Sequence, residues 1–147
     1  MDDIVLKFEG YYDKDELQKK GFDCSGIYTV YVGKSKNNLR ALIYIGESGD
    51  IENRLKPKKS KVSDLKIELQ HNKYPEWENE LKADEKLFFG FVEIDDSNRE
   101  RVEAALIYEH QPICNNQHKE SFGYSAISIK TEKKNELLKK EFELIPK

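Results

Sequence analysis

Two short apolar segments separated by a polar one form the clearest pattern in the chain. β-branched and aromatic residues fill 27–32 and again 42–45, which is typical of β-strands. The segment 33–40 between them is polar and contains two adjacent asparagines, which favour a turn. We therefore predict an antiparallel hairpin at the centre of the fold. Such a strand pair can bring the hydroxyl groups of Tyr28 and Tyr44 to one face of the sheet, although both are also ordinary sheet residues.

The remaining pattern predicts one more strong strand and a series of helices. Residues 87–94 are almost all apolar, which indicates a strand buried on both faces. Shorter strands are predicted over 2–9 and 125–129. Helices are predicted over 13–20, over 51–55 with Asp50 as N-cap, from Ser60 or Ser63 to Gln70, over 97–110, and from Thr131 to Glu143.

The helix over 97–110 has the clearest start signal. Ser97 followed three residues later by Glu100 fits a capping box, and the apolar residues that follow are spaced for one buried face. With the hairpin and the 87–94 strand, these elements predict an α/β (α+β) fold. Its sheet would be small, mostly antiparallel and three-stranded, with helices packed around it.

The chain of 147 residues is predicted to be a single domain over 1–147. It has no apolar run near 18 residues, and its acidic start lacks the basic region of a signal peptide, so we expect a cytoplasmic protein with no membrane association. Cys24 and Cys114 are isolated, which fits a reducing compartment. The three histidines are too widely spaced to indicate a zinc site.

Positive charge is concentrated in one part of an acidic chain. The net charge is −3, yet residues 54–73 carry seven basic and two acidic side chains, a local net charge of +5. This segment fits a phosphate-bearing partner such as DNA, and it equally fits a solvated surface. The candidate DNA-binding residues are Arg54, Lys56, Lys58, Lys59 and Lys61.

Five further positions occur in a fixed order. Gly-Ile-Tyr ends at Tyr28, Tyr-Ile-Gly begins at Tyr44, and Arg54 follows ten residues later. Glu103 then lies early in the predicted 97–110 helix, and Asn115 comes twelve residues after it. In these motifs the chain resembles the GIY-YIG nuclease family over residues 26–115. The resemblance implies the GIY-YIG nuclease fold, with a motif core over 26–116 and a C-terminal extension over 117–147 that ends in a helix.

The resemblance also implies an activity, a metal-dependent endonuclease that hydrolyses DNA phosphodiester bonds with water as the nucleophile. Glu103 is the only one of the five residues that can hold a hard cation, Mg²⁺ or Mn²⁺, which binds readily through one carboxylate, waters and a phosphate oxygen. Arg54 would bind the scissile phosphate through its planar fork. Tyr28 would be the base or orient water, Tyr44 would contact phosphate or water, and Asn115 would give support or a polar contact.

Each of these residues also has an ordinary structural explanation. Glu103 can pair with Arg99 four residues earlier on the same helix, although Leu106 and Ile107 place it at the border of the apolar face. Arg54 can be a surface arginine. Glu109 is a competing ligand, but it lies near the end of the helix and lacks the spacing to Asn115.

The proton acceptor is left open by the sequence. A free tyrosine has a pKa of about 10, so Tyr28 needs a nearby cation, the metal or Lys58, to lower its pKa. This chain has Glu47 where one branch of the family has lysine, and Lys58 where other branches have tyrosine or histidine. Lys58 is therefore included among the candidate catalytic residues.

Two other functions compete with a general endonuclease. One is a catalytically inactive nucleic-acid-binding module on the same scaffold, which the net acidic charge favours. The other is a dimeric restriction enzyme, whose base-reading side chains we would seek in 34–40 and 71–77.

Overall fold

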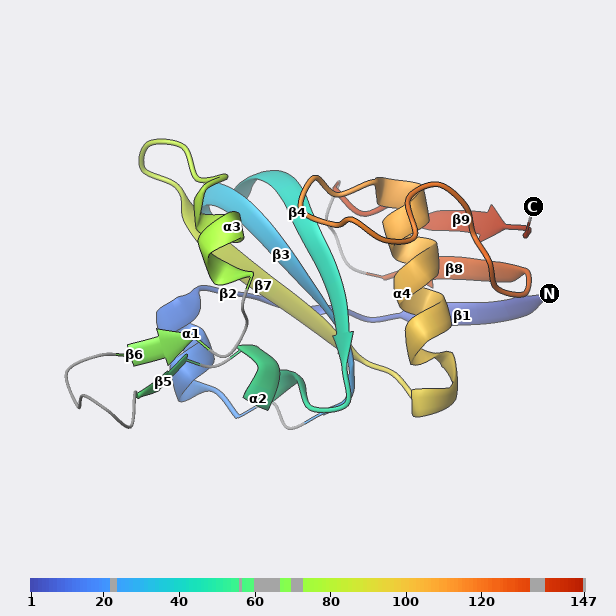
Figure 1. Ribbon diagram of the computed structural model, residues 1–147, viewed down its shortest axis with the longest axis horizontal. Helices are drawn as coiled ribbons and strands as arrows, with labels where there is room; N and C mark the ends of the chain where they lie inside the picture. Colours follow the sequence, from blue (N-terminus) through green and yellow to red (C-terminus); the bar gives the residue numbers. More distant parts are fainter. Residues whose placement is uncertain (22–23, 56, 60–66, 70–72, 133–136, 147) are drawn as a thin grey trace.

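The computed structural model describes residues 1–21, 24–55, 57–59, 67–69, 73–132 and 137–146. Within these ranges the fold is α+β, with a four-stranded antiparallel sheet, a three-stranded mixed sheet, a small two-stranded ribbon and four helices (Figure 1). None of these four helices is long and apolar enough to cross a membrane. The strands are β1 (Asp2–Leu6), β2 (Glu9–Tyr12), β3 (Gly26–Ser35), β4 (Asn38–Ser48), β5 (Pro57–Lys59), β6 (Ile67–Leu69), β7 (Lys86–Glu93), β8 (Ile127–Thr131) and β9 (Glu141–Leu144). The helices are α1 (Lys14–Lys19), α2 (Ile51–Leu55), α3 (Tyr74–Glu78) and α4 (Asp96–His110).

The predicted hairpin is confirmed as β3 and β4, and it lies at one side of the four-stranded sheet, whose order is β2-β7-β3-β4. The predicted turn over 33–40 was too long, because the strands continue as an exposed ribbon until Ser35 pairs with Asn38. A bulge interrupts the pairing: Val30 lies opposite Tyr44 and Tyr31 opposite Leu42, so the residue between them on β4 has no partner on β3.

The central sheet was predicted with three strands, but β2 adds a fourth, and the second sheet, β1-β8-β9, was not predicted. Strand β1 pairs in parallel with β8, and β9 pairs antiparallel with β8. The expected terminal helix from Thr131 to Glu143 is therefore wrong, since β8 ends at Thr131 and Glu141–Leu144 forms β9. The physical reason is a period of two: Phe142 and Leu144 are buried, whereas the two glutamates that alternate with them are exposed. The middle of the expected helix, 133–136, lies outside the described residues.

Two other local predictions were wrong. In the helix expected from Ser60 or Ser63 to Gln70, residues 67–69 are strand β6, paired with β5, and the rest lies outside the described residues. The capping box at Ser97 is not formed, because α4 starts one residue earlier, with Asp95 as N-cap, and the Ser97 hydroxyl donates to the Asp95 carboxylate. The Asp95 carboxylate makes no cap bond to the backbone either; it accepts from the Ser97 hydroxyl and the Asn98 side-chain amide.

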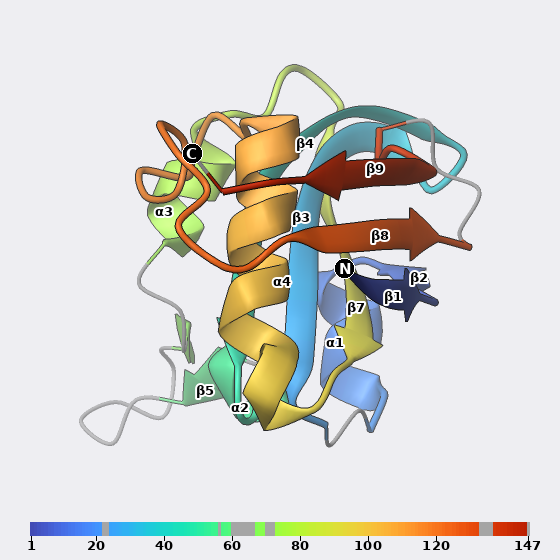
Figure 2. The same ribbon diagram turned by 90° about the vertical axis from the view of Figure 1, so that its right-hand side faces the viewer.

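The two faces of the four-stranded sheet are covered differently. One apolar cluster joins the sheet to α1, α2 and α3 and contains Tyr28, Val30 and Trp77. The other joins the sheet to α4 and to the three-stranded sheet, and contains Ile27 and Phe142. Tyr28 and Val30 on β3 therefore face one side of the sheet and Ile27 the other, as expected for the period of two in a strand. The sheets lie end to end along the molecule, with α4 crossing where they meet and β8 and β9 running crosswise to the helix (Figures 1 and 2).

Candidate active site at the β4 edge

Glycine at position 46 makes room for the ring of Tyr28. A Cβ atom at Gly46 would lie 2.3 Å from Cζ and from the hydroxyl oxygen of Tyr28, far inside van der Waals contact. Gly26 is equally constrained, since a Cβ there would lie 1.9 Å from the carbonyl oxygen of Val92 on β7. The outer glycines of the two tripeptides are therefore packing requirements: one lets β3 approach β7, and the other lets a buried phenol lie flat against β4.

The two tyrosines and Arg54 form one hydrogen-bonded group. Tyr28 is 1% exposed, and its ring stacks on Tyr44 with centroids 6.1 Å apart. Side-chain hydrogen bonds connect Tyr28 to Tyr44 and to Arg54. Arg54 comes from α2, whose first turn is capped as predicted: the Asp50 carboxylate accepts a hydrogen bond of 3.1 Å from the Asn53 backbone N–H.

Burial keeps both phenols protonated. Desolvation raises the pKa of Tyr28 above its ordinary value of 10, Tyr44 and Glu103 raise it further, and the Arg54 guanidinium only partly opposes them. The pKa of Tyr44 is also raised, first by burial and then by the charge of Glu103. A base role for Tyr28 would need a cation that lowers its pKa, but the described protein groups together raise it.

Glu103 faces this group from α4. Its side chain is 18% exposed, and His118 Nε2 lies 3.9 Å from its Oε1. Burial raises the pKa of Glu103 to about 7; the charge of Glu47 raises it further, and a hydrogen bond from the Glu47 backbone opposes this shift. The carboxylate thus lies within electrostatic range of both tyrosines, as the sequence predicted.

Glu103 does not form the alternative surface pair with Arg99. Arg99 pairs with the carboxylates of Glu47 and Asp96 instead. Because Glu47 lies on β4, the Arg99 pair ties the first turns of α4 to the end of the hairpin, and the Glu47 backbone in turn contacts Glu103. Glu47, which departs from the family pattern, is therefore part of the framework around Glu103.

Asn115 clamps the edge of the sheet. Its Oδ1 accepts a hydrogen bond of 2.9 Å from the Ile45 N–H, and its Nδ2 donates one of 2.8 Å to the Ile45 carbonyl oxygen. The neighbouring Cys114 N–H donates to the carbonyl oxygen of Ile43, the bulged residue of β4. The sequence left two roles open for Asn115, support of the structure or a polar contact in the site. These hydrogen bonds are those of a structural support.

A pocket of about 200 Å³ opens between these elements. Tyr44 and Glu103 line it from β4 and α4, and Lys73 and His118 line it from the segments before α3 and after α4. Lys73 and His118 were not chosen from the sequence as site residues. Lys73 was considered only as part of the basic segment and of the possible base-reading stretch 71–77, and no spacing connects His118 to Glu103 before the chain folds.

The basic segment is only partly described. Arg54 is exposed on α2, whereas Lys58 and Lys59 belong to β5 by their backbone, with side chains outside the description. Lys56 and Lys61 lie outside the described residues altogether, and so do residues 71–72 of the expected base-reading stretch 71–77. In the other stretch, 34–40, Arg40 is held by Glu85 and Lys36 by Glu16.

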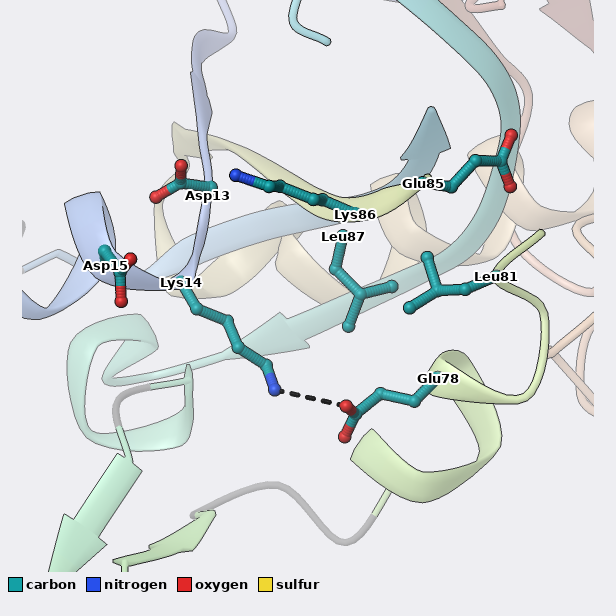
Figure 3. A pocket seen from close by; sticks show the side chains of 8 residues that line it. All are labelled: Asp13, Lys14, Asp15, Glu78, Leu81, Glu85, Lys86 and Leu87. Carbon is teal, nitrogen blue, oxygen red and sulfur yellow. Dashed lines mark ion pairs between the residues drawn. The ribbon is translucent and has the colours of Figure 1, made fainter. Parts of the chain in front are cut away.

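Another pocket, of about 260 Å³, lies on the side of α1 and α3 (Figure 3). Four of its charged side chains already have partners: Lys14 pairs with Glu78 at 3.4 Å, Asp13 caps α1, and Glu85 binds Arg40. Since none of the candidate residues lines it, this pocket is separate from the site at β4.

No model of a known protein family, no curated protein and no solved structure matches this chain. The side chains gathered at the edge of β4 are therefore the basis for a functional proposal.

Proposed function

We propose that this protein is a metal-dependent endonuclease of the GIY-YIG type that hydrolyses DNA phosphodiester bonds with water as the nucleophile. One observation carries the proposal. Tyr28, Tyr44, Arg54 and Glu103 come from four separate elements, and the fold brings both tyrosines within hydrogen-bonding or electrostatic range of Arg54 and of Glu103. Packing alone gives no reason for a half-buried carboxylate near two phenols that also interact with a guanidinium.

Arg54 is the phosphate-binding group of this proposal. It is exposed on α2, and its guanidinium still reaches the Tyr28 hydroxyl. A planar fork with several N–H donors matches the oxygens of a phosphodiester, and it compensates the charge that develops on them during hydrolysis.

Glu103 fits a divalent cation. Its pKa of about 7 means that the surrounding protein does not compensate its negative charge. Within the described ranges no three His, Cys, Asp or Glu side chains cluster as metal ligands. In this proposal Mg²⁺ or Mn²⁺ would be held by Glu103, waters and a substrate oxygen. When bound, the metal would polarise the phosphoryl oxygens and stabilise their developing charge.

The tyrosines act as neutral hydrogen-bonding groups in this proposal. With a pKa above its ordinary value, Tyr28 holds its proton at neutral pH. The Tyr28–Tyr44–Arg54 hydrogen bonds fix the direction of both hydroxyls, so they are suited to orient the attacking water. This favours the water-orienting role of Tyr28 over the role of base.

A catalytically inactive nucleic-acid-binding module is the second candidate. The raised pKa of Tyr28 favours it, because no described group of the protein prepares that phenol to accept a proton. A binding module would use Arg54 and the basic segment in the same way, but it would not depend on Glu103.

Cleavage of supercoiled plasmid with Mg²⁺, Mn²⁺ or EDTA separates the two candidates. We expect metal-dependent nicking by the wild type and a loss of at least about a hundredfold in Glu103→Ala, with unchanged far-UV circular dichroism. Glu100→Ala is the matched control, since Glu100 is exposed on the same helix, and it should retain activity. Full activity in Glu103→Ala would remove the metal-binding role, and salt-dependent DNA binding without any cleavage would favour the module.

A further inference from the structure

A second, larger pocket adjoins the candidate active site. It has a volume of about 720 Å³ and lies along the segment between α4 and β8. Three residues line both pockets: Asn115, Asn116 and His118. The two pockets therefore lie next to each other along this segment.

Aromatic rings form one side of the second pocket. The rings of His118 and Tyr124 have centroids 6.2 Å apart, and Tyr124 lies 5.9 Å from Phe122. Phe122 is buried and belongs to the apolar cluster under α4, so it anchors the other two rings. Tyr124 is half-buried and His118 retains 30% side-chain exposure, which leaves ring surface open to a ligand.

The remaining lining combines apolar surface with hydrogen-bonding groups. Ile113 is 68% exposed, one of the few large apolar side chains that this fold leaves in solvent. Asn116 and Ser121 are exposed at the same pocket and offer both donors and acceptors. The complementary ligand is flat, with apolar faces and polar edges, and a nucleobase has this chemistry.

We propose that the second pocket binds the base of an unpaired nucleotide next to the scissile phosphate, with Tyr124 as its stacking surface. The identification of the ligand as a nucleotide rests on the proposed nuclease function. A base inside a duplex is stacked and paired and has no free face for Tyr124, so the preferred DNA would carry a bulged or single-stranded nucleotide at this place.

Equilibrium binding tests this without any cleavage. Three fluorescein-labelled DNAs are compared by anisotropy in EDTA: a blunt duplex, the same duplex with one bulged nucleotide, and that bulge with an abasic site in place of its base. We expect the bulged base to be bound about tenfold more tightly than the abasic bulge or the duplex. Equal affinities for the bulged base and the abasic bulge would overturn the proposal.

Two pairs of variants test whether the second pocket causes the preference for the bulged base. Tyr124→Ala should abolish it, and Tyr124→Phe, which keeps the ring, should retain it. Because Tyr124 also contacts Phe122, a second pair avoids the core: Ile113→Glu should weaken binding of the bulged base, whereas Ile145→Glu, at 67% exposure outside the pocket, should not. A preference that survives Ile113→Glu and a folded Tyr124→Ala would overturn the pocket assignment.

A failure of the base-pocket proposal can be distinguished from a failure of the nuclease proposal. Metal-dependent plasmid nicking with no preference for the unpaired base would leave the nuclease standing and remove the base pocket. A base preference that depends on Tyr124, in a protein that never cleaves, would support the pocket and contradict the nuclease.

Discussion

Two antiparallel hairpins of this fold, β3–β4 and β8–β9, have opposite character. In β3–β4, glycines at the ends of the strands admit a buried phenol, and charged and polar groups from two helices gather at its edge. In β8–β9, buried apolar and exposed charged residues simply alternate, and the hairpin packs against α4. The first hairpin contains polar groups whose burial is unfavourable, whereas the second contributes only apolar packing. Substitutions should therefore separate the two: in the first they change activity, and in the second they change stability.

The largest effect on stability is expected in the second hairpin. Phe142 is 8% exposed and its ring meets His110 at a centroid distance of 5.7 Å. Phe142→Ala should lower the free energy of unfolding by about 3–5 kcal/mol, measured by urea denaturation, while nicking per folded molecule is unchanged. A loss of activity without a loss of stability would contradict the separation of the two hairpins.

Glu103→Gln should raise the free energy of unfolding, and only at high pH. The folded-state pKa of about 7 lies above the ordinary 4.5, so the folded protein binds more protons between these values and its stability falls as pH rises through this window. Above pH 7 the loss amounts to about 3 kcal/mol, which the glutamine removes. We expect the variant to be more stable than the wild type at pH 8 and equal to it at pH 4. Equal unfolding free energies at both pH values would show that burial does not penalise this carboxylate.

Gly46→Ala should lower activity by about a hundredfold, because the added methyl group would displace the Tyr28 ring and with it the hydrogen bonds to Tyr44 and Arg54. Plasmid nicking measures this. Gly21→Ala is the control, since nothing lies within 4 Å of a Cβ at that position and Gly21 lines neither pocket of the proposed site. Wild-type activity in Gly46→Ala would mean that the position of Tyr28 is not needed.

The smallest of these effects is expected at the clamp on β4. Asn115→Ala removes two hydrogen bonds to the Ile45 backbone and should cost about 2 kcal/mol in the free energy of unfolding. Asn116→Ala, next to it and exposed, should cost almost nothing. If both variants unfold at the same urea concentration, the side chain of Asn115 does not hold the edge.

The sequence predicted what local patterns determine. The β3–β4 hairpin, the strand β7 and the bounds of α2 all follow from runs of β-formers, glycines and a capping aspartate near in the chain. The three-stranded sheet was missed because β1 pairs with β8 across more than a hundred residues, and because the short alternation in β9 follows a segment rich in helix-forming lysine and glutamate.

The candidate site was also predicted only in part. Tyr28, Tyr44, Arg54 and Glu103 were found because their order along the chain resembles a family pattern. His118 and the Arg99–Glu47 pair were missed, since only the folded chain brings α4, β4 and the segment after α4 together. The raised pKa of Tyr28 was missed for the same reason: it depends on burial, which no motif encodes.

The clamp on β4 also covers part of a sheet edge. As the last strand of its sheet, β4 would offer unpaired amide and carbonyl groups to any extended peptide, including an identical strand of a neighbouring molecule. Asn115 and Cys114 occupy these groups at Ile45 and Ile43. The same loop that lines the pocket thus leaves fewer free backbone groups for another strand to pair with along β4.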